Sequence, residues 1–212
     1  MVIKSISYDQ EEIIENILKL HVPSGKIDCD PTYSKGNFYK GKIQSPEFKF
    51  DLKPVSDEVI QSCATSLPLQ SESINCLMFD PPFVMGSGPS ILNPKEGSNV
   101  TISRFSCFRN PKELLSFYKE ALAEFYRVLN DNGVLIFKCQ DCVISAKNVM
   151  SHVVVMNQAV KTGFYPKDLF ILNAKARLIS GKVKKQQHAR KFHSYFWVFE
   201  KRASKIDYNS FL

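Results

Sequence analysis

Hydrophobic and polar residues follow two different periods along this chain. Apolar residues recur at helical spacing over residues 9–20 and, most clearly, over residues 112–129, where an Asn-Gly pair at 132–133 follows as a helix-ending signal. The same spacing predicts shorter helices over residues 54–64 and 145–162. Short apolar runs, several of which end at an acidic residue, predict the β-strands 26–30, 48–52, 74–80, 133–139, 169–173 and 193–201.

The order of these elements favours an α/β fold. Strands that alternate with helices form a doubly wound, mostly parallel sheet, and the last two predicted strands indicate an antiparallel hairpin at its C-terminal end. With 212 residues the chain is long enough for one substantial core and short for two, so we expect a single domain over residues 1–212. Residues 84–110 form an irregular region that is too long for an idle connection, which indicates a binding role.

The composition is that of a globular protein, with 44% hydrophobic and 23% charged residues, and it excludes a disordered or collagen-like chain. The sequence has neither an apolar run long enough to span a membrane nor the apolar core of a signal peptide, so we expect a cytoplasmic protein. Six cysteines, most of them in strand-like runs, favour reduced thiols over disulfides. Cys139 and Cys142 form a CxxC pair, but no second Cys or His pair follows at suitable spacing, so we expect no metal site.

Basic residues give the chain a formal net charge of +7, and this excess is concentrated in one segment. Residues 175–191, the basic stretch, contain no acidic residue, and without them the positive and negative counts are equal. A block of this kind favours a polyanionic partner such as nucleic acid, although a solvated loop that aids solubility explains the run equally well. The basic side chains of the stretch are Lys175, Arg177, Lys182, Lys184, Lys185, Arg190 and Lys191.

Three aspartates share a position at the ends of predicted strands. Asp30, Asp51 and Asp80 each end an apolar run, and the carboxyl ends of parallel strands meet at the edge of the sheet where ligands bind. We therefore expect the three carboxylates at one edge. If the strand at 169–173 runs parallel to the others, the basic stretch leaves from that same edge and overlooks the site.

The tetrapeptide Asp80-Pro81-Pro82-Phe83 follows directly on one of these strands. An exocyclic base amine is a poor nucleophile because its lone pair is delocalised into the ring, so a catalyst must accept hydrogen bonds from both of its hydrogens. A carboxylate and the carbonyl of Pro81 could do so, the prolines fix where these acceptors point, and Phe83 offers a face for an extruded base. A proline-rich turn without a catalytic role is the alternative. The tetrapeptide resembles the catalytic motif of S-adenosylmethionine-dependent amino methyltransferases, which modify adenine or cytosine in nucleic acids.

An upstream loop resembles the donor-binding loop of the same family. It begins with Asp30 and runs through Gly36 to Tyr39, and Ser34 stands in place of the first of the family's two glycines. Glycine suits these positions because the main chain must approach the cofactor closely.

Three other places extend the resemblance. Asp51 follows Asp30 by about 20 residues, where the family has an acid that binds the ribose of the donor. Residues 65–69 resemble the segment that lines the donor adenine, with Cys63 where an Asp is expected, and residues 138–141 resemble a stretch near the mouth of the active site. The resemblance thus assigns donor binding to Asp30, Pro31, Thr32, Tyr33, Gly36, Asp51, Ser66 and Leu67.

The resemblance implies a class I, Rossmann-like methyltransferase that transfers a methyl group from S-adenosylmethionine to a base amine. Within this family an Asp before the two prolines favours adenine as the target base, and DNA is the expected substrate. The chain resembles a small phage or prophage form of these enzymes. Arg104 and Arg109 in the irregular region, together with the basic stretch, are the expected contacts to nucleic acid. The alternatives are methylation of RNA or of a protein glutamine, or a nucleic-acid-binding module without catalysis, which the departures at Ser34 and Cys63 suggest.

Overall fold

The structure is a computed structural model that describes residues 2–81, 111–144, 147–175 and 187–202. Its helices within these residues are α1 (Gln10–His21), α4 (Pro111–Val128), α5 (Ser151–Thr162) and the short 3-10 helix η1 (Asn37–Tyr39). Its strands there are β1 (Ile6–Ser7), β2 (Cys29–Asp30), β3 (Phe48–Asp51), β4 (Ile60–Gln61), β5 (Ile74–Phe79), β6 (Leu129–Cys139), β7 (Cys142–Ile144), β8 (Lys147–Val149), β9 (Phe164–Asn173) and β10 (His193–Lys201).

Eight of the described strands form one sheet in the order β1-β9-β10-β6-β5-β2-β3-β4, and β7 pairs with β8 in a separate antiparallel hairpin. β10 runs antiparallel to its neighbours β6 and β9, whereas the other pairs in the sheet are parallel. The mostly parallel sheet and the antiparallel hairpin that the sequence predicts are therefore confirmed. Because β6 and β9 are both antiparallel to β10, their carboxyl ends lie at the same edge of the sheet.

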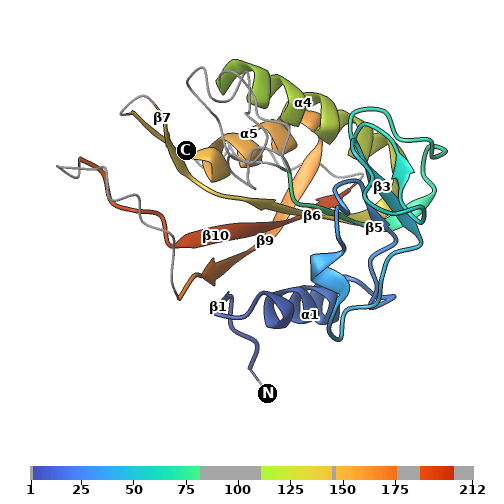
Figure 1. The fold of residues 1–212 in the computed structure, drawn as a ribbon, viewed down its shortest axis with the longest axis horizontal. Coiled ribbons are helices and arrows are strands. Elements are labelled where there is room, and N and C mark those ends of the chain that lie inside the picture. Colours follow the sequence, from blue (N-terminus) through green and yellow to red (C-terminus); the bar gives the residue numbers. More distant parts are fainter. Residues whose placement is uncertain (1, 82–110, 145–146, 176–186, 203–212) are drawn as a thin grey trace.

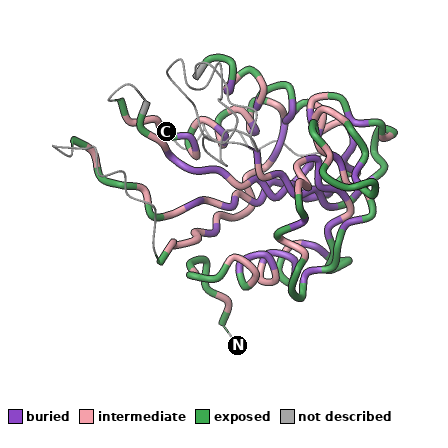
Figure 2. Tube along the Cα trace, in the orientation of Figure 1, coloured by how far each residue is buried: buried purple, intermediate pink, exposed green. Residues whose placement is uncertain are grey.

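Helices cover both faces of the sheet, with α4 and α5 on one face and α1 on the other (Figure 1). Successive side chains of β5 point to opposite faces. Leu77 and Phe79 pack in the core beneath α4 and α5, whereas Cys76 and Met78 pack in the core beneath α1. Because both faces are covered, β5 and the second half of β6 are buried almost throughout (Figure 2).

The first turn of α1 lies at the edge of the sheet where β6 and β9 end. β1 is parallel to β9, so its carboxyl end points to this edge, and α1 begins a few residues later. The side chain of Asp9 caps the helix by accepting a hydrogen bond from the Glu11 amide at 2.9 Å. Ile13 and Ile17 are fully buried against the sheet. This packing brings Gln10 to the sheet edge.

Residues 54–64 do not form the predicted helix. They contain turns and the two-residue strand β4, and the apolar side chains of Val55 and Ile60 are each 57% exposed. β4 pairs with β3 instead, with Ile60 opposite Phe50. The apolar spacing in this segment is helical, but hydrogen bonding to the open edge of the sheet decides its conformation.

Two helix ends also differ from the predicted ones. α4 ends at Val128, because Leu129 already pairs with β5, and the Asn-Gly pair lies inside β6, where Asn132 has a φ of 63°. α5 begins at Ser151 rather than near residue 145, because β7 and β8 pair as a hairpin before it. In addition, β9 is longer and β2 shorter than the segments that the sequence predicts.

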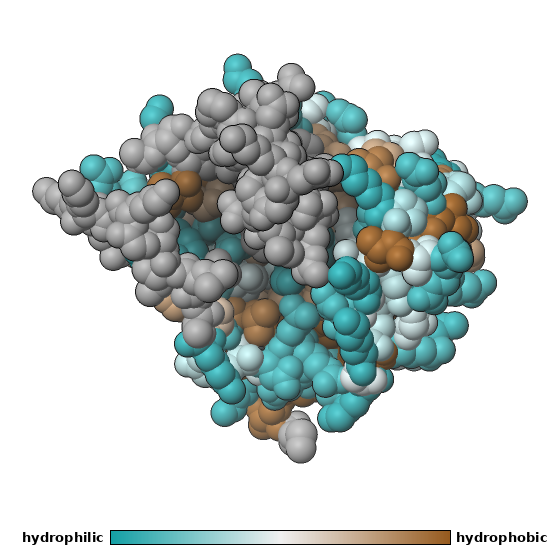
Figure 3. Space-filling view, viewed as in Figure 1, coloured by the Kyte–Doolittle hydropathy of each residue, from teal (hydrophilic) through white to brown (hydrophobic). Residues whose placement is uncertain are grey.

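Apolar side chains on the described surface are scattered. The face in Figure 3 is mainly hydrophilic, with small, separate apolar patches. Single exposed apolar residues such as Leu20 and Leu52 are normal on a protein surface. Over the part of the chain that the structure describes, no helix combines the length and the apolar character that crossing a bilayer requires.

Candidate active site

Asp30, Asp51 and Asp80 meet at one edge of the sheet, as the sequence predicts. Asp30 and Asp51 are the last residues of β2 and β3, and Asp80 directly follows β5. These strands are neighbours in the order β5-β2-β3 and run parallel to one another, so their carboxyl ends lie side by side. In α/β sheets of this kind, ligands bind at the carboxyl edge.

Asp30 is completely buried, and both of its carboxylate oxygens are hydrogen-bonded within the chain. Oδ1 accepts hydrogen bonds from the amide and the hydroxyl of Thr32 at 2.8 and 3.0 Å, and Oδ2 accepts one from the Tyr39 hydroxyl at 2.7 Å. Burial raises the pKa of Asp30 to about 7, and the hydrogen bonds from Tyr39 and Thr32 limit the rise. Asp30 therefore organises the loop that follows β2 from beneath.

Thr32 connects this loop to the residue that follows β5. Its Oγ1 accepts a hydrogen bond from the Asp80 amide at 2.9 Å and donates one to Asp30 Oδ1. The position of the Asp80 main chain is thus coupled to the buried Asp30 carboxylate through one hydroxyl group. Pro31, which lies between Asp30 and Thr32 in the sequence, is buried.

Ser34 and Gly36 both have a left-handed backbone, with φ angles of 50° and 60°. Ser34 replaces a glycine of the expected donor loop, yet it takes the conformation that glycine adopts most readily. Its amide donates a hydrogen bond to Asp51 Oδ2 at 3.0 Å, which ties the loop to the end of β3. At Gly36 a Cβ atom would lie 2.6 Å from the Tyr33 hydroxyl, so a side chain there would displace the Tyr33 ring, which stacks on Tyr39.

The two oxygens of the Asp80 carboxylate differ in their contacts with the residues that the structure describes. Oδ2 lies 3.1 Å from Nζ of Lys138 on β6. Oδ1 is buried and has no hydrogen-bond partner among the described residues. A buried acceptor without a partner is costly in a folded protein, so at a ligand-binding edge it marks a place where a ligand can donate a hydrogen bond. The sequence places Lys138 near the mouth of the site but gives no sign of its contact with Asp80.

Residues 65–69 are fastened to α4. The Leu67 amide donates a hydrogen bond to Glu124 Oε1 at 2.7 Å, and Arg127 donates one to the Leu67 carbonyl at 3.3 Å. The hydrogen bond from Arg127 also lowers the pKa of Glu124. Leu67 is buried in the core, whereas Ser66 is exposed. The Leu67 side chain therefore stabilises the core. A ligand that binds here would contact Ser66 and the main chain.

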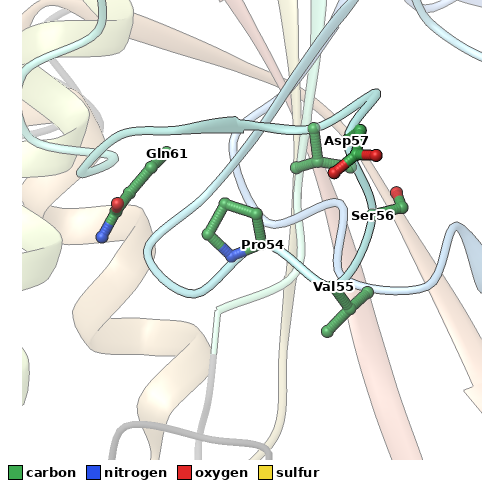
Figure 4. Close-up of a pocket in the computed structure, with 6 residues that line it drawn as sticks. Pro54, Val55, Ser56, Asp57 and Gln61 are labelled. Carbon is green, nitrogen blue, oxygen red and sulfur yellow. The ribbon is translucent and has the colours of Figure 1, made fainter.

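Asp51 borders two features of the loop that follows β3. Its carbonyl accepts a hydrogen bond from the Ser62 amide at 3.0 Å, so the chain leading to residues 65–69 starts beside it. The same loop forms a hollow of about 530 Å³ on the surface (Figure 4). The hollow is lined by Pro54, Val55, Ser56, Asp57, Val59 and Gln61. None of the residues assigned to donor binding lines it, so the hollow lies beside the expected donor site.

A second polar cluster lies at the carboxyl end of β6. The buried Asp141 carboxylate pairs with Nδ1 of His152 at 2.7 Å and accepts a hydrogen bond from the Tyr195 hydroxyl at 3.4 Å. The His152 and Tyr195 rings stack at 4.2 Å, and His193 Nε2 lies 2.9 Å from the same hydroxyl. Burial and the nearby Asp141 charge raise the pKa of Tyr195 to about 12. The cluster joins the start of α5 to the start of β10.

The two ends of the basic stretch lie together at this edge. The Ala174 amide donates a hydrogen bond to the Phe192 carbonyl at 2.6 Å, directly beyond β9 and directly before β10. Lys175 and Arg190 are exposed, and Lys191 is partly buried. Because β9 is parallel to β5 and β6, the stretch leaves from the edge that carries Asp80, as the sequence predicts.

Several residues named from the sequence lie outside the described residues. They are Pro82, Phe83, Arg104, Arg109, Arg177, Lys182, Lys184 and Lys185. Pro81 is described and is buried.

The CxxC cysteines form no disulfide, and Sγ of Cys142 lies 3.8 Å from the Ser151 hydroxyl. Within those residues, no group of three or more His, Cys, Asp and Glu side chains is placed to hold a metal ion. Cys139 and Cys142 are free, and burial raises the pKa of both thiols. A thiol whose pKa is raised is a weak nucleophile and a weak metal ligand at neutral pH.

Comparisons with known proteins show the family and the fold. A DNA methylase family model matches residues 74–211, which is well over half of the chain. No curated protein matches the sequence. Among solved structures, a candidate methyltransferase from Haloferax volcanii in complex with the Trm112 activator has a TM-score of 0.50 at 10% identity, over 86% of this chain and 84% of the other.

Two further structures come from Thermus thermophilus. TrmN has a TM-score of 0.50 at 11% identity, over 92% of this chain and 50% of TrmN. A candidate DNA modification methylase complexed with S-adenosyl-L-methionine has a TM-score of 0.42 at 13% identity, over 66% of this chain and 52% of the other, so this chain spans about half its length. The fold is that of class I methyltransferases, and the match over residues 74–211 shows that the chain belongs to the DNA methylase family, whose members use S-adenosylmethionine.

Proposed function

We propose that the protein transfers a methyl group from S-adenosylmethionine to the exocyclic amine of a base, with adenine in DNA as the substrate. The observation that carries this proposal is the buried Oδ1 of Asp80 at the carboxyl edge of the sheet, which has no hydrogen-bond partner in the described part of the chain. An amine hydrogen would give this oxygen the partner that it lacks. Acceptance of that hydrogen bond favours a pyramidal nitrogen, whose lone pair is free to attack.

In this proposal the residues after Asp80 complete the amine site. The Pro81 carbonyl accepts the second amine hydrogen, Pro82 fixes the direction of the turn, and Phe83 stacks on the extruded base. The Asp80 amide is held by Thr32 and one of its carboxylate oxygens by Lys138. Asp80 therefore loses little conformational freedom when the substrate binds.

The chain's own residues fit the donor at the neighbouring strand ends. When bound, S-adenosylmethionine supplies an activated methyl group, so neither a metal ion nor a covalent enzyme intermediate is required. Each Asp51 oxygen accepts one main-chain hydrogen bond, from Ser34 or Lys53, and keeps a second lone pair for a ribose hydroxyl. The loop that Asp30, Thr32 and Gly36 shape between β2 and β3 then faces the rest of the donor, with Pro31 and Tyr33 as its walls. Ser66 and the Leu67 main chain border the adenine.

We assign nucleic-acid binding to the basic stretch and to Arg104 and Arg109. Lys175, Arg190 and Lys191 stand at the root of the stretch, at the edge that carries Asp80. Phosphate contacts from this position would hold a duplex over the site without reading its sequence. A base must leave the duplex to reach Asp80 Oδ1, because an exocyclic amine within the stack is paired.

The proposal is tested by transfer of labelled methyl groups from S-adenosylmethionine to unmethylated DNA, to RNA and to a protein extract, followed by mass spectrometry of the digested nucleosides. We expect label in DNA and its recovery as N6-methyladenine. Recovery as N4-methylcytosine would overturn the assignment of adenine as the target base. Label found only in RNA or protein would overturn the assignment of DNA as the substrate.

Two variants connect the activity to the site. Asp80→Ala should abolish transfer while donor binding, measured by calorimetry, persists. Asp57→Ala removes an exposed carboxylate from the neighbouring hollow and serves as the matched control, with activity unchanged. An active Asp80→Ala protein would show that this carboxylate does not hold the amine.

A further inference from the structure

We propose that Lys138, supported by Gln10, is a positioning residue for Asp80. It holds Oδ2 of the carboxylate so that Oδ1 alone is presented to the substrate amine. This inference rests on the proposed function, and it adds to that function two residues to which the sequence analysis assigns no role in binding the donor or the amine. Gln10 comes from α1, which precedes the part of the chain that the family model matches.

The Lys138 ammonium group is held on several sides. Nζ lies 3.1 Å from Asp80 Oδ2 and 3.0 Å from Gln10 Oε1. The same atom lies 5.0 Å from the centre of the Phe38 ring and 5.6 Å from that of Phe196. Aromatic rings attract a cation at such distances. The Lys138 side chain is only 12% exposed, so its charge is directed at Asp80 rather than at solvent.

The register of the sheet fixes this pair. β5 and β6 are parallel neighbours with Phe79 opposite Phe137, so Asp80 and Lys138 are the next residues along each strand. The Asp80 amide is held by Thr32, which leaves rotation of the carboxylate as its main freedom. The ion pair removes this rotation. Without it, either oxygen could turn away from the substrate, and a misplacement of about 1 Å is enough to slow a reaction strongly.

Contacts elsewhere in the sheet supply a matched control. Lys167 on β9 also forms an ion pair with a sheet carboxylate, Glu200, and its side chain is 25% exposed. It lies in the first half of β9, away from the carboxyl edge. Replacing Lys167 or Lys138 by Met removes one positive charge from an ion pair between neighbouring strands, which are antiparallel at Lys167 and parallel at Lys138. Only Lys138 contacts Asp80.

The test compares Lys138→Met, Lys138→Arg and Lys167→Met in methyl transfer. For Lys138→Met we expect kcat to fall by about 10²-fold, with the KM for DNA and the donor dissociation constant close to those of the wild type. Lys138→Arg should recover much of the loss, because it keeps a cationic donor beside Oδ2. Lys167→Met should keep the wild-type kcat. An unchanged kcat in Lys138→Met, or a loss seen only in KM, would overturn the proposal.

A structural readout separates this inference from the proposed function. Crystal structures of the wild type and of Lys138→Met should show the Asp80 carboxylate rotated in the variant. If the wild type transfers no methyl group, the proposed function fails. The comparison of the two crystal structures then still tests whether Lys138 positions the Asp80 carboxylate. A carboxylate that keeps its place in Lys138→Met overturns it. If Lys138→Met does not fold, Gln10→Ala gives the same readouts, with a smaller fall in kcat.

Discussion

The main-chain amide of Asp80 donates a hydrogen bond to Thr32 Oγ1 at 2.9 Å, and the same hydroxyl donates to the buried Asp30 carboxylate. Two loops at the ends of neighbouring strands are thereby joined through one side chain. The loop expected to bind the donor and the residue expected to hold the substrate amine therefore cannot move independently. A methyltransferase needs this coupling, because the amine nitrogen and the methyl group must be aligned before they react.

Removal of the Thr32 hydroxyl tests this coupling. Thr32→Val keeps the shape of the side chain but leaves the partly buried Asp80 amide without its acceptor. We expect the free energy of unfolding to fall by about 1–3 kcal/mol, as measured by urea denaturation, and methyl transfer to slow. Thr32→Ser keeps the hydroxyl and should stay close to the wild type in both measurements. A fully active and equally stable Thr32→Val protein would argue against a role for this contact.

The raised pKa of Asp30 makes stability depend on pH. In the unfolded chain an Asp ionises near pH 3.9, whereas burial raises the pKa of Asp30 to about 7 in the folded protein. Between these values the unfolded state releases the proton first, so the contribution of Asp30 to stability is full below about pH 4 and is lost as the pH rises through about 7. Asp30→Asn cannot ionise.

The measurement is the free energy of unfolding of the wild type and of Asp30→Asn at about pH 5 and about pH 8. We expect the difference between the two pH values to be smaller in the variant, because this source of the decline with rising pH is absent from it. An identical decline in both proteins would contradict the buried position of this carboxyl group.

Asp51→Ala separates donor binding from nucleic-acid binding. Its carboxylate anchors the Ser34 amide and is expected to bind the donor ribose. We expect the dissociation constant for S-adenosylmethionine, measured by calorimetry, to rise much more than that for DNA, measured by gel shift. The reverse pattern would assign Asp51 to the nucleic-acid surface.

Neutralisation of Lys182, Lys184 and Lys185 tests the basic stretch. Each lost phosphate contact should lower the slope of log affinity against log salt by about 0.9, so the triple Gln variant should bind DNA more weakly and with a flatter salt dependence. A variant with Gln at the exposed positions Lys26, Lys53 and Lys112 loses the same charge elsewhere and should keep the wild-type slope. Equal salt-dependence slopes in the wild type and both variants would contradict a role of the basic stretch in binding DNA.

The sequence predicts the parts of the site whose signals are local. Asp30, Asp51 and Asp80 each stand at the end of an apolar run, and parallel strands bring such ends together. The contacts of Lys138 and Gln10 have no local signal. They depend on the register between β5 and β6 and on the packing of α1 against the sheet, which join residues far apart in the chain.

In the fold, too, the sequence predicts the elements with strong local patterns and misses those that long-range contacts decide. The helix α4 has a strongly periodic apolar pattern, and the buried strand β5 is a nearly continuous apolar run, so the sequence predicts both. Residues 54–64 have a helical pattern too, yet Val55 and Ile60 stay exposed because β4 pairs with the open sheet edge. Propensity over a short segment is weak compared with a sheet edge that offers free hydrogen-bonding groups.

The most direct test is a crystal structure of the protein with S-adenosylhomocysteine. We expect the ligand between the ends of β2 and β3, with its ribose hydroxyls on the Asp51 carboxylate and its sulfur facing the space in front of Asp80 Oδ1. A ligand bound on the other side of the sheet, or a space beside Asp80 closed by the protein's own side chains, would contradict methyl transfer at this site.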